Sequence, residues 1–259
     1  MGFLQWNDIR RYTLQLTASP RPKFLNTRQT YLSYELEYIT DHNNQLQYRI
    51  IEPKITNFFN DESYIFVGLS NYYDRVQFPF ELGSTVIPPG IYKYNVFAVS
   101  YGSDLSRKIS GIVQGGAGSF YNGEFQGVGF STYLRPNDRF AVDLDWTWNR
   151  VDVPFPNGKF TSSILGARIN YSFTTDLFAK AYIQWNDFEN RIISNFLVRY
   201  RYKPGSDFYF VYNEESNTGG KFTTAKRTLI AKFTYLLASE SRWDFVLKVI
   251  EKANYLEDI

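Results

Sequence analysis

Two pairs of carboxylates in the sequence have a spacing that acid–base chemistry can use. Asp143 and Asp145 form one pair, and Glu35 and Glu37 form the other. In an extended strand, residues two apart lie on the same face at a separation of about 6–7 Å, which suits a pair of catalytic carboxyl groups. Because no recognisable nucleophile accompanies either pair, we interpret the four residues as the lining of a wet face.

Other catalytic and metal-binding groups are scarce. The chain has no cysteine, which excludes thiolate metal sites and cysteine nucleophiles. Its only histidine, His42, lies in a turn-forming cluster of Asp and Asn residues. A catalytic histidine needs support from packing, and one histidine alone does not make a metal site. The sequence therefore predicts no enzyme activity, no cofactor and no metal.

Basic residues gather instead on the polar faces of neighbouring strands late in the chain. They are Arg168, Lys180, Arg199, Arg201 and Lys232. The acidic pairs fall on polar faces of other strands, so a basic wall and an acidic wall across a lumen would create a transverse field that selects solutes by charge. The alternative is a set of ion pairs that brace the interior. Tyr182, on one of these faces, is suited to stacking on a sugar.

The segment from Leu177 to Leu237 contains the elements that must position these side chains. In its first part, an apolar set alternates with a polar set that includes Lys180 and Tyr182; the apolar set is Leu177, Ala179, Ala181, Ile183 and Trp185. Side chains in a strand alternate between two faces. Three similar stretches follow, separated by turn clusters such as Lys203 to Asp207. The segment is therefore expected to form a meander of hairpins with one apolar and one polar face.

The same pattern extends over most of the chain. The sequence has 259 residues, of which 19% are aromatic. Roughly a dozen or more alternating stretches of about 9–13 residues are longer than ordinary globular strands, and they match the length that a tilted strand needs to cross a bilayer. Aromatic residues crowd the strand ends, as in membrane barrels. We therefore predict an all-β, up-and-down antiparallel transmembrane β-barrel of about 14 strands over residues 1–237. A soluble barrel or sandwich with an aromatic core is the alternative.

Two segments depart from this pattern. Residues 75–90 contain three prolines and two glycines, which is too many prolines for a central strand, so we expect a long loop that is also the best candidate for a plug. Residues 238–259 form a C-terminal extension. In it, Ser241 and Asp244 have the spacing of a helix capping box, whereas residues 243–250 also alternate as one more strand, and both interpretations remain open.

A string of short motifs resembles one known family. The motifs include Ile87-Pro88-Pro89-Gly90, Tyr101-Gly102-Ser103-Asp104, Gln184-Trp185-Asn186, Pro204-Gly205-Ser206-Asp207 and Val211-Tyr212-Asn213. They resemble the uncharacterised outer-membrane barrel family whose members carry an N-terminal carbohydrate-binding module of family-nine type. The resemblance runs from Arg75 to Leu237 and implies the C-terminal barrel of a longer protein. That module is missing from this sequence, and residues beyond Leu237 pass the expected end of the family.

These expectations define a function. The barrel is expected in the outer membrane of a Gram-negative cell, where the lipid bilayer is its partner and where it acts as a conduit for small polar solutes. Saccharides as the cargo are implied by the resemblance alone. The alternative is a non-conducting barrel that anchors a binding module or a partner protein at the outer membrane. A net charge of +2 is too balanced to suggest a nucleic-acid partner. No stretch approaches the roughly 18 apolar residues of a transmembrane helix.

Overall fold

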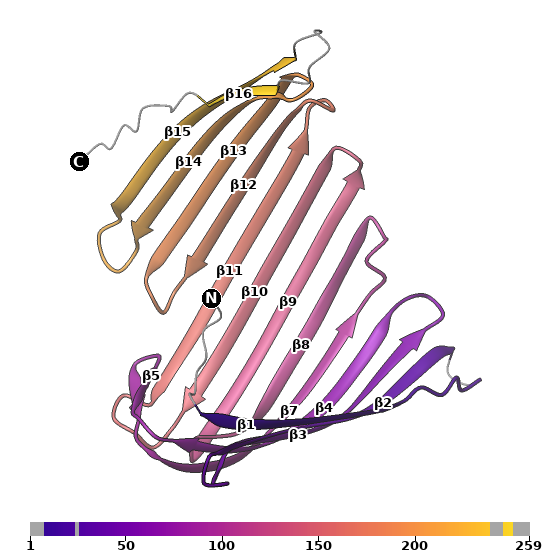
Figure 1. Ribbon diagram of the computed structural model, residues 1–259, viewed down its shortest axis with the longest axis vertical. Coiled ribbons are helices and arrows are strands. Elements are labelled where there is room, and N and C mark those ends of the chain that lie inside the picture. Colours follow the sequence, from indigo (N-terminus) through magenta and orange to yellow (C-terminus); the bar gives the residue numbers. More distant parts are fainter. Residues whose placement is uncertain (1–7, 24–25, 239–245, 251–259) are drawn as a thin grey trace. The chain divides into compact units, whose positions relative to one another are not determined.

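The computed structural model describes residues 8–23, 26–238 and 246–250, and most of them form β-strands (Figure 1). The strands are β1 (Ile9–Ala18), β2 (Thr27–Asp41), β3 (Leu46–Phe59), β4 (Tyr64–Val76), β5 (Phe80–Leu82), β6 (Thr85–Ile87), β7 (Gly90–Gly102), β8 (Ile109–Phe120), β9 (Gly123–Asn137), β10 (Phe140–Asp152), β11 (Lys159–Ser172), β12 (Leu177–Asn186), β13 (Arg191–Lys203), β14 (Ser206–Asn217), β15 (Thr223–Ala238) and β16 (Val246–Ile250). The prediction of an all-β, antiparallel, up-and-down fold is confirmed.

Fourteen of these strands form one sheet whose order follows the sequence from β1 to β16, with β5 and β6 set apart as a separate hairpin. Apart from its two end strands, each strand of the large sheet therefore pairs with the sheet strands that come before and after it along the chain, as an up-and-down meander requires. β1 and β16 stand at the two ends of this order.

The turn between β8 and β9 consists of Tyr121 and Asn122. Their φ angles of 45° and 66° suit a two-residue hairpin turn, in which both central residues have positive φ. Asn-Gly is a common pair at the centre of such turns, but here Gly123 follows the turn. Gly123 begins β9, where a Cβ atom would lie 2.0 Å from the carbonyl oxygen of Asp152. A close approach of two backbones, rather than the turn, therefore requires this glycine.

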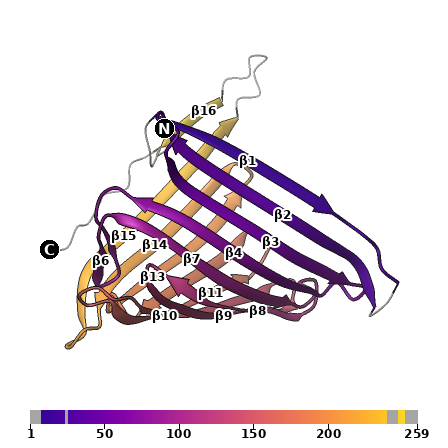
Figure 2. The same cartoon turned by 90° about the horizontal axis from the view of Figure 1, so that it is seen from below.

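The chain divides into two compact units, which are described separately. The first comprises the residues up to 106 together with 110–130 and 147–162. Within it, β1, β2, β3 and β4 run side by side (Figure 2). Its core is a small cluster of buried residues, namely Val76, Ile87, Tyr92, Tyr94, Tyr121, Val151 and Val153.

Residues 75–90 were predicted to form one long loop, but the structure shows strand ends and a short hairpin in this segment. β4 continues to Val76, β7 starts at Gly90, and β5 and β6 form a short hairpin between them. The prolines explain the interruption, because none of the three lies inside β5 or β6 and a proline cannot donate a hydrogen bond to a strand pair. Gly83, with a φ of 59°, forms the turn of this hairpin.

The second unit comprises residues 107–109, 131–146 and the described residues from 163 onward. β11 to β15 pair in unbroken sequence order, with bulges after Arg201 and after Glu215. β16 pairs with β15, and Ala238 is the last residue of β15, so the described residues of the extension, 238 and 246–250, lie in strands and not in a helix. The capping-box residues Ser241 and Asp244 lie outside the described residues.

In each unit, one face of the strands carries apolar side chains that remain exposed. Examples in the first unit are Leu14, Leu16, Ile55, Leu69 and Phe97, and examples in the second unit are Leu165, Ile183, Phe196, Phe210 and Phe233. Within the described residues, only eight hydrophobic side chains are buried, whereas several times that number of large hydrophobic side chains are exposed. The part of the chain that the structure describes has no helix long and apolar enough to cross a membrane.

Candidate functional site

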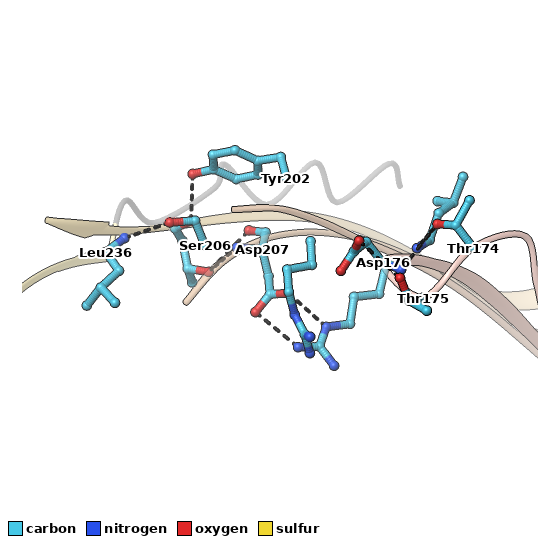
Figure 3. Close-up of polar contacts among 11 residues, drawn as sticks. Thr174, Thr175, Asp176, Tyr202, Ser206, Asp207 and Leu236 are labelled. Carbon is cyan, nitrogen blue, oxygen red and sulfur yellow. Dashed lines mark hydrogen bonds and ion pairs between the residues drawn. The ribbon is translucent and has the colours of Figure 1, made fainter. Parts of the chain in front are cut away.

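A cluster of charged residues lies at the β13–β14 hairpin of the second unit, on the polar face of the strands (Figure 3). The Asp207 carboxylate accepts hydrogen bonds from Nε and Nη2 of Arg199, at 2.9 and 3.1 Å. The Nε atom of Arg201 lies 3.8 Å from the same carboxylate. Two guanidinium groups therefore share one carboxylate, and the cluster keeps a positive charge.

The hairpin backbone holds Asp207 in place. Asp207 N–H donates to the Thr234 hydroxyl at 3.1 Å, and the buried Ser206 hydroxyl accepts from Leu236 N–H at 2.9 Å. The Tyr202 hydroxyl donates to the Thr234 carbonyl at 3.0 Å. Figure 3 shows Tyr202 on one side of the strands and the Asp207 side chain on the other. The two faces therefore separate at this hairpin as the alternation of residues requires.

The strand register brings other predicted basic residues close to this cluster. Arg199 lies opposite Phe178 on β12 and opposite Tyr209 on β14, and Tyr209 lies opposite Lys232 on β15. The Arg199 guanidinium lies 5.8 Å and 5.5 Å from the ring centroids of Phe178 and Tyr209. Lys180 Nζ lies 5.3 Å from the Phe178 ring. The rings of Phe178 and Tyr209 thus make cation–π contacts with the neighbouring basic side chains.

Arg168 meets one member of the first acidic pair, Asp143, elsewhere on the polar face of the second unit. The nearly buried carboxylate of Asp143 is bound by the Arg135 guanidinium and lies 3.7 Å from Nη1 of Arg168. Asp145 accepts a hydrogen bond from the Ser131 hydroxyl at 2.7 Å. The Asp143 carboxylate therefore has two arginines as partners, Arg135 and Arg168. A carboxylate that is nearly buried needs such partners to offset the cost of removing its charge from water.

Tyr182 lies beside Arg168. The two residues are opposite each other in the β11–β12 register, and the guanidinium lies 5.4 Å from the ring centroid. The Tyr182 hydroxyl donates to Oε1 of Gln184 at 2.7 Å. One face of this ring is therefore engaged by a cation, and its hydroxyl has a side-chain acceptor.

The second acidic pair belongs to the first unit. Glu35 lies 2.6 Å from Lys54 Nζ and accepts a hydrogen bond from Gln15 at 3.1 Å. Glu37 lies 2.6 Å from Arg11 Nε. Each glutamate thus has a cationic partner on a neighbouring strand of the same unit, and neither belongs to the unit that holds the predicted basic residues.

A polar cluster that the sequence did not predict lies in the first unit. The Tyr121 hydroxyl donates to Oδ2 of Asp74 at 2.7 Å. The Tyr121 ring lies 5.0 Å from Tyr92 and 5.1 Å from Tyr94, and Tyr94 stacks on Tyr72 at 4.8 Å. Burial, reinforced by the hydrogen bond to Asp74, raises the pKa of Tyr121. The signal was present in the sequence, because residues 72, 74, 92 and 94 have the same parity within their two strands.

The β5–β6 hairpin covers this tyrosine cluster. Phe80 packs against Tyr121 with a ring separation of 5.7 Å, and Ile87 is fully buried. The Thr85 hydroxyl donates to the Pro156 carbonyl at 2.7 Å, and the Ser84 hydroxyl donates to the Asn157 carbonyl at 2.8 Å. The hairpin is therefore tied to the turn between β10 and β11 within the first unit.

These groups can pair, stack and attract charge. In the part of the chain that the structure describes, no group of three or more His, Cys, Asp or Glu residues could hold a metal ion. Compared with known proteins, the chain matches no family model and no curated protein. The resemblance to the outer-membrane barrel family therefore stays a prediction.

Proposed function

We propose that this chain is an outer-membrane β-barrel of a Gram-negative cell that acts as a conduit for small polar solutes. The observation that carries the proposal is the division of the strands into an exposed apolar face and a charged polar face. Soluble proteins rarely expose contiguous apolar patches larger than a few hundred Å². A bilayer gives such a face an apolar solvent, and the charged face then borders water.

Closure of the sheet is part of this proposal. In hydrocarbon, an open strand edge leaves backbone groups without partners, at a cost of several kcal/mol for each group. We therefore propose that the meander closes by pairing β1 with the last strand. A closed meander has no free edge, which is the only form in which strands span a bilayer.

The polar face supports passage of polar solutes more than catalysis. Arg199, Arg201 and Lys232 lie near one another with Asp207 as the carboxylate that pairs with the two arginines. A local excess of positive charge in a water-filled lumen favours anions and oriented dipoles. Saccharides remain the proposed cargo on the strength of the family resemblance, with aromatic side chains such as Tyr182 available for stacking.

Ion conductance in a planar lipid bilayer tests the proposal directly. The purified chain is first examined on a heat-modifiability gel, which reports whether a barrel has formed. We expect reproducible conductance steps from the heat-modifiable species. Arg199→Glu is expected to shift the reversal potential toward cation preference, whereas Arg199→Lys keeps the charge and serves as the matched control. A protein that stays soluble without detergent would contradict the membrane proposal itself.

A second candidate function is a non-conducting barrel that anchors a binding module or a partner protein. The β5–β6 hairpin favours this second function. The hairpin packs on the tyrosine cluster and is held by two hydrogen bonds, so it is suited to act as a plug that blocks the proposed lumen. A heat-modifiable species that gives no conductance would support this anchor in place of the conduit.

A further inference from the structure

Three basic residues lie close to Tyr73 in the strand register, on the face of the first unit that carries the exposed apolar side chains. Arg49 on β3 and Lys93 on β7 are both directly opposite Tyr73 on β4, and Arg75 follows two residues later on β4. Lys93 Nζ lies 5.8 Å from the Tyr73 ring centroid. With strands about 5 Å apart, the Arg49 and Lys93 backbones are separated by about 10 Å, a span that two long basic side chains can close around one anion.

These three cations lack acidic partners in the structure. Within residues 8–23, 26–238 and 246–250, Arg49, Arg75 and Lys93 form no ion pair with a carboxylate. Arg49 donates to Oδ1 of Asn71 at 2.8 Å, and Arg75 donates to Oε1 of Gln45 at 3.0 Å. Elsewhere in this unit, by contrast, Arg11 and Lys54 are paired with glutamates. Within the described residues, no carboxylate therefore compensates these three charges.

Apolar side chains continue from this cation cluster along the same strands. Ile55, Leu69 and Phe97 have the same strand parity as Arg49, Tyr73 and Lys93 and share their face. They are 48%, 46% and 47% exposed. This surface is positively charged where the three basic residues lie and apolar farther along the same strands. It therefore complements a molecule with an anionic headgroup and apolar chains.

We propose that Arg49, Arg75 and Lys93 form a binding site for the phosphate headgroup of a membrane lipid whose acyl chains lie along Ile55, Leu69 and Phe97. The inference rests on the proposed membrane function. Guanidinium and ammonium groups bind phosphate oxygens through charge-assisted hydrogen bonds, and Tyr73 is a residue type that favours the boundary between headgroups and hydrocarbon. A soluble anion would use the cations but leave the adjoining apolar surface exposed, so the continuity of the two favours a lipid.

Native mass spectrometry of the detergent-purified, delipidated protein tests the site. The probes are phosphatidylglycerol, the corresponding diacylglycerol without phosphate, and inorganic phosphate. We expect phosphatidylglycerol to be retained in preference to diacylglycerol. The double substitution Arg49→Gln with Lys93→Gln should require about 30-fold more lipid for the same occupancy, since each cation near a membrane surface contributes roughly a fivefold effect.

The matched control is Arg11→Gln with Lys54→Gln, which removes two cations from the opposite face of the same unit. Its lipid retention should equal that of the wild type. Equal losses in both double variants, or equal binding of the two lipids, would overturn the site. Displacement of the lipid by inorganic phosphate would assign the site to a free anion and would contradict the proposed lipid ligand.

Should the double variant fail to give a heat-modifiable species, Lys93→Gln alone should weaken lipid retention about fivefold. Unchanged lipid retention in this single variant would contradict the proposed site.

Failure of this inference can be distinguished from failure of the proposed function. A protein that gives no heat-modifiable, detergent-requiring species contradicts the membrane barrel. A barrel that forms and conducts, but retains both lipids equally, contradicts only the headgroup site.

Discussion

At the residue scale, the sequence predicts the face of the strand on which a side chain lies better than it predicts the residue with which that side chain pairs. The two-residue period assigns Lys180 and Tyr182 to one face of their strand, and the β12 register agrees because side chains alternate. The partner of a charge depends on how adjacent strands are aligned, which bulges and turns determine. For that reason, neither the sharing of Asp207 by Arg199 and Arg201 nor the hydrogen bond between Tyr121 and Asp74 followed from the sequence alone.

Gly205 is a residue whose replacement should destabilise the fold. Its φ is 76°, and an added Cβ would lie 2.4 Å from Leu236 Cδ2. Gly205→Ala is expected to lower the free energy of unfolding by about 1–2 kcal/mol, because L-residues disfavour this backbone region. Urea unfolding followed by tryptophan fluorescence measures the change. Gly166→Ala is the control, since its nearest neighbouring atom is 3.9 Å from the added Cβ; equal effects of the two substitutions would contradict the prediction.

Tyr121 should stabilise the first unit through its hydroxyl. Tyr121→Phe keeps the ring contacts and leaves Asp74 without its phenol donor. We expect a loss of about 1–3 kcal/mol in the free energy of unfolding, which is typical for a polar group left unsatisfied. Tyr101→Phe is the control because Tyr101 is 45% exposed. Indistinguishable unfolding midpoints for the two variants would show that the hydroxyl of Tyr121 contributes nothing.

The raised pKa of Tyr121 also predicts a pH dependence. A pKa that is higher in the folded than in the unfolded protein gives stability that is present below the ordinary tyrosine pKa of about 10 and is lost as the pH rises above it. The difference in unfolding free energy between wild type and Tyr121→Phe should therefore be constant from pH 7 to about pH 9 and should shrink near pH 11. A difference that grows in alkali would contradict the assignment.

At the element scale, turn chemistry and proline content were informative only in part. The alternation predicted the strands of the large sheet because both faces are chemically distinct over their whole length. The prolines of residues 75–90 correctly excluded a continuous strand, but they did not reveal the β5–β6 hairpin. That hairpin depends on packing against Tyr121 and on hydrogen bonds to residues 156 and 157, which are distant in sequence. For the C-terminal extension, the sequence was compatible with a helix or with one more strand, and residues 246–250 form a strand that pairs with β15.

The hairpin itself yields a prediction about passage through the lumen. Replacing residues 78–87 by a short Gly-Ser linker removes the contacts of Phe80 and Ile87 with the tyrosine cluster. If the hairpin narrows the conduit, the unitary conductance should increase at least twofold, because ion flow scales with the open cross-section. The same linker placed at the β14–β15 turn, residues 218–222, is the control. A shortened hairpin with unchanged conductance would show that this segment does not obstruct the lumen.

At the scale of the whole molecule, the proposed function depends on which solvent each face of the sheet meets. Few hydrophobic residues are buried in the described part of the chain, and the largest set of apolar side chains is exposed on one face of the strands. The sequence indicated both the apolar face and the strand length that suits a bilayer, because these are local properties. The proposed closure of the sheet and the proposed lumen depend on contacts between distant strands, which local patterns do not encode.

The most direct test of the central claim is a single-cysteine scan along β12 in lipid vesicles. The chain has no native cysteine, so each of positions 178–185 can be replaced in turn and treated with a membrane-impermeant, charged maleimide. We predict labelling at Lys180, Tyr182 and Gln184, which lie on the polar face, and protection at Ala179, Ala181 and Ile183, which lie on the apolar face. An alternating pattern means that one face of β12 meets water and the other meets lipid. Uniform labelling of both sets, or a chain that remains in solution without lipid, would contradict the membrane barrel.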